Sequence, residues 1–250
     1  MRLISWNING GFPLAGLEPV TYTPEEKLDY FITLLLEQSP DIVCLQEVHI
    51  NEVRSQAEEI ARALGLAQQF VTIASPSHVD PSYQLANAVL SRYPFELKAE
   101  ICHPKPRFEL NLPLLPDGTY PKVHDKVTQV FKFETFTLAN THLIPLEFFG
   151  ASYESPKGKA FARELELLWL EHLSEPLLFC GDFNLSAVLR TFPELISRFE
   201  LQDVLPQESS SIFNPERIDF ILASSQFHVA KAELMHVNCD HALCLLDILS

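Results

Sequence analysis

Short apolar runs recur along the whole chain and constrain its fold more than any other feature, and several of them end in a polar or acidic residue. Apolar runs of this kind, bounded by turn residues, are typical of strands buried on both faces. They predict strands at 2–6, 42–45, 69–73, 87–91, 127–133, 136–141, 176–180, 218–223 and 242–248. The chain is therefore expected to be an α/β protein built on extensive sheets.

Helical patterns lie between these strands. Thr23-Pro24-Glu25-Glu26 has the spacing of a capping box with proline at the first helical position, which predicts a helix from residue 24 to Ser39-Pro40. Apolar residues at helical spacing predict further helices at 53–64 and 158–173. This order of elements favours stacked mixed sheets covered by helices, with an open doubly wound sheet as the alternative. Residues 103–121 hold five prolines and no clear period, so they are expected to form a long surface loop.

Composition narrows the class of protein. A chain of 250 residues that is 47% hydrophobic can bury one large core, and we expect a single domain over residues 1–250. A formal charge of −15 without a basic stripe argues against tight, non-specific binding to duplex nucleic acid. No apolar run is long enough to span a membrane and no signal-peptide core follows Met1, so a cytoplasmic location without membrane insertion is expected. The five cysteines are widely spaced and predict neither a disulfide framework nor a zinc knuckle.

Glu47 follows the apolar run 42–45 and is the first candidate for a metal ligand. Mg²⁺ prefers one or two carboxylates together with water and phosphate oxygens. Asn7, which follows the strand at 2–6, could add an amide oxygen or orient Glu47. The alternative is that Glu47 is a carboxylate that only caps a loop.

Asp182 and Asn184 lie two residues apart after the run 176–180, beyond Gly181. In an extended segment this spacing would point both side chains the same way, so that one could orient a water and the other contact a phosphoryl oxygen. An ordinary Gly-Asp turn with an Asx hydrogen bond is the alternative.

Two histidines are candidates for contact with a phosphate. A carboxylate that holds the ring of His241 would keep it oriented and protonated. Adjacent residues on a strand point oppositely, so Asp219 from another strand is a better partner for His241 than Asp240. His142 would be a second phosphate-contacting group.

Together, these segments resemble the endonuclease/exonuclease/phosphatase superfamily, also called DNase I-like. The resemblance rests on WNIN at 6–9, LQEV at 45–48, NAVLSRYP at 87–94, NTHL at 140–143, GDFN at 181–184, RIDFILAS at 217–224 and CDHALCLL at 239–246. It implies a four-layer sandwich, in which two mixed β-sheets pack face to face with helices outside.

The resemblance also implies a role for each residue. Glu47 corresponds to the principal metal-binding glutamate, Asn7 to its polar neighbour, and Asp240 to an acid that can touch a second metal. Asp182 would align or activate water, Asn184 and His142 would contact the phosphate, and Asp219 would partner the catalytic His241. Asn9, Asn87 and Arg92 lie in the matching segments and are expected to contact substrate. Mg²⁺ is the expected cofactor, with Mn²⁺ as a substitute.

The substrate is less constrained than the reaction. Hydrolysis of a phosphodiester by attack of water is expected, on a short or single-stranded nucleic acid, because His142 and the short 209–216 connection depart from the pattern of abasic-site endonucleases. A phosphatase or phospholipase C-like enzyme acting on a small phosphoester or lipid headgroup is the alternative, and a catalytically silent binding module is a remote one. The Phe148-Phe149 segment could contact substrate or simply pack. No obligate protein partner is expected.

Overall fold

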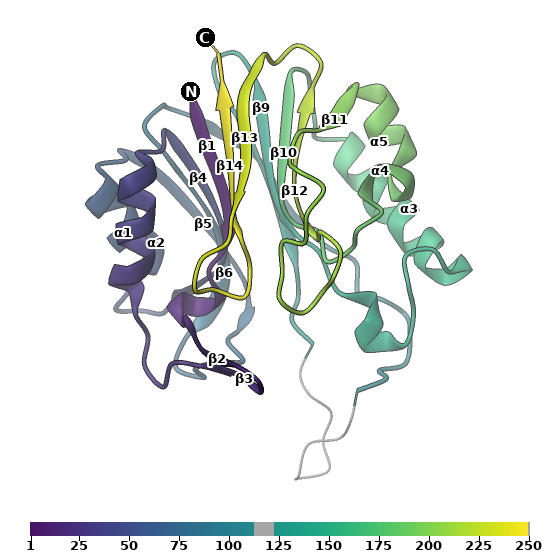
Figure 1. The fold of residues 1–250 in the computed structure, drawn as a ribbon. Helices are drawn as coiled ribbons and strands as arrows, with labels where there is room; N and C mark the ends of the chain where they lie inside the picture. The colour runs from purple at the N-terminus through teal and green to yellow at the C-terminus, as the bar shows by residue number, and fades with distance from the viewer. Residues whose placement is uncertain (113–122, 250) are drawn as a thin grey trace.

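The computed structural model describes residues 1–112 and 123–249 and contains two six-stranded sheets that pack face to face (Figure 1). The first sheet has the order β13 (Val229–Met235), β14 (Leu243–Ile248), β1 (Arg2–Asn7), β4 (Ile42–Ile50), β6 (Gln84–Ser91), β5 (Gln68–Pro76). The second has the order β11 (Leu201–Asp203), β12 (Asp219–Ser224), β10 (Leu177–Asp182), β9 (Thr137–His142), β8 (Val127–Lys132), β7 (Glu96–Cys102). Both sheets are mixed, because β1 pairs with β4 and β9 with β10 in parallel.

Helices cover the outer face of each sheet and complete the four layers (Figure 1). Beside the first sheet lie α1 (Leu28–Gln38) and α2 (Gln56–Leu64). Beside the second lie α3 (Pro156–Leu170), α4 (Val188–Thr191) and α5 (Pro193–Arg198). Apolar side chains such as Leu3, Phe131 and Leu178 fill the space between the sheets. The predicted sandwich is therefore confirmed, and the alternative of one open sheet is wrong.

The first helix begins later than its sequence predicts. α1 starts at Leu28, and Thr23 Oγ1 donates to Glu25 O (2.8 Å) rather than capping a helix. Glu26 instead accepts two hydrogen bonds from the guanidinium of Arg54, at 2.7 and 2.8 Å. The Glu26 carboxylate therefore pairs with Arg54 and does not form the capping box.

The other two predicted helices are shifted at their starts. α2 begins at Gln56, where Ser55 Oγ accepts a hydrogen bond from Glu58 N (3.3 Å). Val53 is 91% exposed and lies outside the helix. α3 begins at Pro156 and ends at Leu170, because Ser155 caps it and Pro156 occupies its first turn.

The strands missed by the sequence analysis lie mostly at edges. β13 is an edge of the first sheet and β7 an edge of the second, and both expose several side chains, including Glu96, Lys98 and Lys231, so neither reads as an apolar run. β11 and the hairpin of β2 (Leu14–Leu17) and β3 (Val20–Tyr22) are short. Residues 103–112 contain no helix or strand, as predicted, while 113–121 lie outside the described residues.

A buried polar cluster joins the two sheets. The amide of Asn140 donates from Nδ2 to Leu45 O, Ala88 O (both 3.2 Å) and Gln129 Oε1 (3.0 Å). Its Oδ1 accepts from Gln46 Nε2 at 2.7 Å. Because burying an amide without partners is costly, this cluster sets how the sheets align. Gln46 precedes Glu47, and Asn140 lies two residues before His142, so the same contacts position both site residues.

Candidate active site

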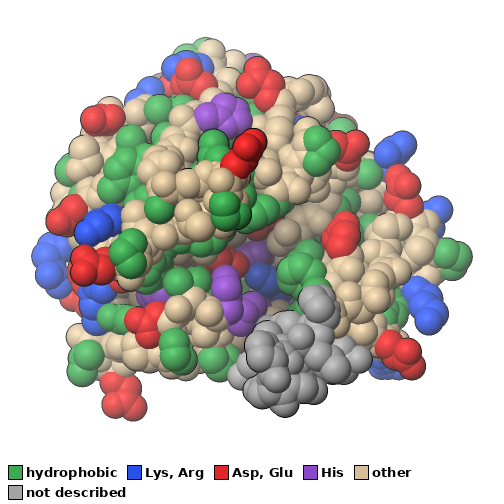
Figure 2. Space-filling model, turned by 60° about the horizontal axis from the view of Figure 1, so that its bottom comes forward, with side chains coloured by type: hydrophobic (Ala, Val, Ile, Leu, Met, Phe, Trp, Pro, Cys, Tyr) green, Lys and Arg blue, Asp and Glu red, His purple; other side chains and the backbone are tan. Residues whose placement is uncertain are grey.

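Strands from both sheets end at a cavity of about 440 Å³. Figure 2 shows histidine and basic side chains gathered in a hollow on this side of the molecule. The first sheet and its connections contribute Asn7, Asn9, Glu47, Asp240 and His241 to the wall. The second sheet and its connections contribute His142, Asp182 and Asn184. Eight of the predicted site residues, separated by up to 234 positions in the sequence (7 to 241), are thus brought together.

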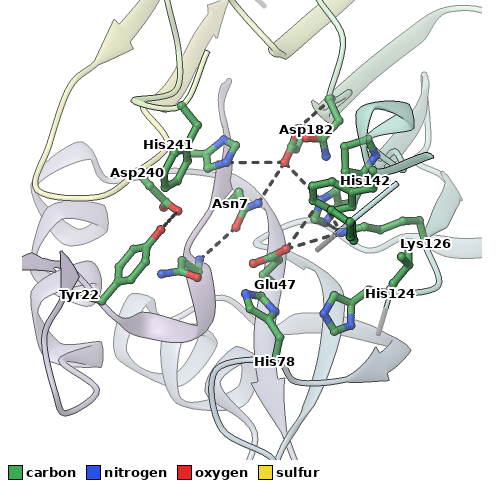
Figure 3. Close-up of a pocket in the computed structure, with 17 residues that line it drawn as sticks. Asn7, Tyr22, Glu47, His78, His124, Lys126, His142, Asp182, Asp240 and His241 are labelled. Atoms are coloured by element: carbon green, nitrogen blue, oxygen red, sulfur yellow. Dashed lines mark hydrogen bonds and ion pairs between the residues drawn. The ribbon is translucent and has the colours of Figure 1, made fainter. Parts of the chain in front are cut away.

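Asp182 lies at the centre of this group. Its Oδ2 accepts a hydrogen bond from Asn7 Nδ2 (3.1 Å) and lies 3.3 Å from His142 Nε2 and 3.8 Å from His241 Nε2 (Figure 3). Burial by itself would raise the pKa of Asp182, but the positive charges of His241, His142 and Lys126 lower it well below its ordinary value. The carboxylate is therefore ionised, and its donors hold it in one orientation.

The chain reaches this arrangement through the unusual backbone at the end of β10. Gly181 has φ +139°, and a Cβ there would lie 1.9 Å from Thr141 O, so only glycine fits. Asn184 N donates to Asp182 Oδ1 (2.9 Å), which is the Asx hydrogen bond of the alternative prediction, yet both side chains still line the cavity. Asn184 Nδ2 donates to Leu143 O (2.9 Å) and keeps a second N–H for another acceptor.

His241 is held by Asp219, as the sequence predicts. Its Nδ1 lies 2.9 Å from Asp219 Oδ2, and both residues are buried. Ser210 Oγ donates to the same carboxylate oxygen (2.7 Å) and accepts from the amide of Asp219 (2.9 Å), which fixes Asp219 from behind. Burial opposes protonation of His241, but the charges of Asp219, Asp182 and Asp240 outweigh it and raise the pKa of the ring well above its ordinary value.

Glu47 lies in a β-bulge of β4, where the pairing with β6 shifts between Leu45 and Val48. Its φ of +57° turns the side chain into the cavity. Glu47 Oε1 lies 3.6 Å from Lys126 Nζ and 3.8 Å from His142 Nε2. Burial alone would raise the pKa of Glu47, but the charges of Lys126, His142 and His78 lower it to about 2.

The surroundings of Glu47 fit a hard divalent cation. Among the described residues, the nearest cation to its carboxylate is Lys126, which lies beyond hydrogen-bond distance at 3.6 Å, so the oxygens remain available. Asn7 pairs with Gln46, the neighbour of Glu47, and both Asn7 and Glu47 point into the cavity (Figure 3). One carboxylate and one amide oxygen, with room for water, is the ligand set that Mg²⁺ accepts.

A second group of acids and histidine could also hold an ion by distance alone. One ligand atom from each of Asp182, Asp219 and His241 lies within 4.8 Å of the others. In this group, however, His241 Nδ1 and Asp219 Oδ2 already share a hydrogen bond (2.9 Å), so the arrangement suits a proton better than a metal.

Asp240, which is expected to touch a second metal, is hydrogen-bonded within the protein. Its Oδ2 accepts a hydrogen bond from the hydroxyl of Tyr22 (2.8 Å), and Cys239 Sγ donates to its Oδ1 (3.3 Å). Burial, the charge of Asp240 and the hydrogen bond between Tyr22 and Asp240 all raise the pKa of Tyr22 well above its ordinary value, so the phenol remains a donor. Both carboxylate oxygens therefore have protein donors.

Of the other three residues expected to contact substrate, one lines the cavity and two do not. Asn9 lines the cavity, and its backbone N–H donates to Asn7 Oδ1 (3.0 Å). Asn87 is buried and donates from Nδ2 to Val127 O (3.2 Å), where it supports the start of β8. Arg92 does not reach the cavity: its Nε pairs with Asp41 (3.2 Å), which precedes β4 at the opposite end of the sheet.

Four polar residues of the cavity wall were missed by the sequence analysis: Tyr22, His78, His124 and Lys126. Lys126 had a usable signal, because the predicted strands 127–133 and 136–141 pair as an antiparallel hairpin. In such a hairpin, the start of the first strand meets the end of the second, which places Lys126 beside His142. The other three lie on the β3 strand and on connections, whose position no local pattern indicates.

The two packed sheets and the acid–histidine site define a phosphoester hydrolase of the DNase I-like class. The profile of the Endonuclease/Exonuclease/phosphatase family matches residues 4–239, and the chain belongs to this family. A search of curated protein sequences gives no match.

Solved structures are similar in fold at low sequence identity. An endonuclease/exonuclease/phosphatase from Beutenbergia cavernae DSM 12333 is 18% identical, with a TM-score of 0.68 over 99% of this chain and 71% of that chain. The catalytic domain of human Nocturnin is 18% identical (TM-score 0.62, covering 100% of this chain and 94% of that chain). A mannosyl-6-phosphatase from Bacteroides thetaiotaomicron VPI-5482 is 15% identical (TM-score 0.60, 100% of both chains). At these identities the similarity shows the fold alone.

Among the described residues, no helix is both long enough and apolar enough to cross a membrane.

Proposed function

We propose that residues 1–250 act as one catalytic domain that hydrolyses a phosphodiester with Mg²⁺, or with Mn²⁺ in its place. The observation that carries this proposal is the convergence of Asn7, His142 and His241 on one oxygen of Asp182. These residues come from both sheets and from both ends of the chain, which supports one catalytic unit. Glu47 and Asn7 would hold the cation, whose charge, when it is bound, offsets that of the phosphoryl oxygens.

The described side chains supply the other needs of the reaction. Asp182 orients the attacking water by accepting a hydrogen bond from it, because its carboxylate is ionised and is held by hydrogen bonds from Asn7 Nδ2 and the backbone N–H of Asn184. His241, kept protonated by Asp219, donates to a phosphoryl oxygen and stabilises the charge that develops in the transition state. His142 and Asn184, whose second N–H is free, also line the cavity and hold the remaining oxygens.

The aromatic lining of the cavity and the net charge of the chain support a short or single-stranded substrate. Its apolar side includes Pro145, Phe148 and Phe213, of which the two phenylalanines are 39% and 61% exposed. Exposed aromatic rings beside a phosphate site suit the stacking of unpaired bases. Because the chain carries a charge of −15, a long duplex would gain little from counterion release.

A phosphatase acting on a small phosphoester or lipid headgroup is the second candidate. The limited volume of the cavity, about 440 Å³, favours it, since a small ligand would fill that space. A silent binding module is disfavoured, because a complete set of acids and histidines is assembled in the cavity.

Hydrolysis of bis-p-nitrophenyl phosphate with Mg²⁺ tests the proposal. We expect Asp182→Asn to lower kcat by at least ~10²-fold, as for loss of one acid–base group, and the exposed His228→Asn to have no effect. Activity that survives both excess EDTA and Asp182→Asn would contradict the proposal. A comparison of short single strands, duplexes and small phosphate esters at fixed salt then separates the two candidates.

A further inference from the structure

Three basic side chains gather in one part of the cavity, and none of them contacts the scissile phosphate in the reaction proposed above. His78 lies on the connection between β5 and β6, His124 precedes β8, and Lys126 follows two residues later. The rings of His78 and His124 are 4.9 Å apart, and Ser75 Oγ holds His124 Nδ1 at 2.9 Å. Figure 3 shows both rings beside Glu47, away from His241.

The two histidines of this basic cluster (His78, His124 and Lys126) have no acid partner among the described residues, whereas Lys126 lies near Glu47. The carboxylates of the described cavity wall are Glu47, Asp182 and Asp240. Glu47 pairs with Lys126 and His142, Asp182 with the site histidines, and Asp240 with Tyr22. Within the described ranges, neither His78 nor His124 has a carboxylate within 4.0 Å, although the chain as a whole is strongly acidic.

The protonation of His124 would respond to an anion bound in this cluster. Burial and the nearby charges of Lys126, His78 and His142 lower the pKa of His124 to about 4, against a smaller opposing effect of Glu47. A bound anion would reverse this effect, because it would be adjacent to all three basic groups of the cluster.

We propose that His78, His124 and Lys126 form a second anion subsite, which binds a phosphate of the substrate other than the one that is hydrolysed. The proposal rests on the proposed function and narrows it to phosphoesters that carry a second phosphate close to the scissile one. Three donors match the three terminal oxygens of a phosphate, and charge-assisted hydrogen bonds of this kind are the strong ones. The second phosphate could belong to a short nucleotide strand or to a sugar, since both present the same group.

Binding without turnover tests the subsite. Isothermal titration in EDTA compares two matched pairs: the dinucleotide TpT with its 5′-phosphorylated form pTpT, and fructose 6-phosphate with fructose 1,6-bisphosphate. We expect the added phosphate to tighten binding about tenfold in at least one pair, as one or two charge-assisted hydrogen bonds would. The pair that responds identifies whether the skeleton is a nucleotide or a sugar.

Variants assign that gain to the subsite. His78→Asn and His124→Asn should each remove most of the gain while leaving the affinity for TpT or fructose 6-phosphate within about twofold. His172→Asn, exposed and remote from the cavity, is the matched control and should keep the full gain. Because His78 is exposed, its variant tests the subsite even if His124→Asn unfolds.

Two results would overturn the subsite: equal binding of both members of both pairs, or a gain that persists in His78→Asn. Both are independent of the proposed function, which would instead fail through the absence of metal-dependent hydrolysis.

Discussion

His241 Nδ1 lies 2.9 Å from Asp219 Oδ2, and Ser210 Oγ lies 2.7 Å from the same oxygen. The carboxylate therefore both orients the imidazole ring and favours its charged form. Because the folded protein raises the pKa of His241, the ring stays protonated at neutral pH and loses its proton only as the pH rises through that raised value.

Loss of His241 and loss of Asp219 should lower kcat by nearly the same factor. We expect His241→Ala and Asp219→Ala each to lower kcat by at least ~10²-fold, and the double variant to add little, because they act as one unit. Asp219→Asn should also lower the pKa of His241 and move the alkaline limb of the kcat/KM profile to lower pH. Additive losses, or an unmoved alkaline limb, would argue against the pairing.

Glu47→Gln should weaken Mg²⁺ binding by at least tenfold, because it removes the only carboxylate of the described cavity wall whose oxygens lack a hydrogen-bond donor. Isothermal titration with Mg²⁺ measures this directly. Glu100→Gln is a matched control, since Glu100 accepts from Thr72 Oγ1 (2.6 Å) and does not line the cavity. Unchanged Mg²⁺ affinity in Glu47→Gln would refute the metal assignment.

Lys126→Met should destabilise the metal-free protein by about 3 kcal/mol, because it leaves the largely buried carboxylate of Glu47 (13% exposed) without its nearest cation. Folding lowers the pKa of Glu47 from 4.5 to about 2, so its contribution to stability is present above pH 4.5 and is lost as the pH falls towards 2. In Lys126→Met the pKa of Glu47 in the folded protein should be higher, so this acid loss should be smaller than in the wild-type chain. Urea unfolding between pH 3 and 7 in EDTA measures both effects, and an unchanged free energy of unfolding at pH 7 would contradict them.

Tyr22→Phe should change the number of ions that the site binds. The hydroxyl of Tyr22 donates to Asp240 Oδ2 (2.8 Å), so its removal frees an oxygen that a second cation could use. We expect Mn²⁺ titration followed by electron paramagnetic resonance to give one ion in the wild-type chain and a second, weaker ion in Tyr22→Phe. Two ions bound to the wild-type chain would show that Tyr22 does not exclude the second.

The neighbouring phenylalanines Phe148 and Phe149 should respond differently to truncation. Phe148 is 39% exposed and lines the cavity, whereas Phe149 packs against the core beside α3, with its ring 6.2 Å from that of Phe108. Phe148→Ala is expected to lower kcat/KM with little change in Tm, and Phe149→Ala to lower Tm. If Phe148→Ala lowers only Tm, its ring is part of the packing and does not contact substrate.

The sequence by itself determined the central strands of both sheets and most of the site. Strands such as β1 and β10 are buried on both faces, so their apolar runs are readable without tertiary information. Asn7, His142 and Asp182 end such strands and Glu47 lies within one, which is why strand prediction also located them. The pairing of His241 with Asp219 followed from the opposite directions of adjacent strand residues.

Only the tertiary structure decided the features that depend on a distant partner. Glu26 forms an ion pair with Arg54 instead of capping a helix, and Arg92 pairs with Asp41 away from the cavity. Edge strands such as β7 are half exposed, so the apolar signal that marks the central strands is absent from them.

Within the cavity, too, the partners of the site residues come from distant segments. The donors that Tyr22 and Cys239 provide to Asp240, and the ammonium that Lys126 brings to Glu47, depend on the packing of separate segments. The local pattern of a sequence specifies which residues a strand buries and which it presents at its end. The charge and hydrogen-bond partners that each residue then meets come from other segments, and here they set the protonation of His241 and the freedom of Glu47 to bind a cation.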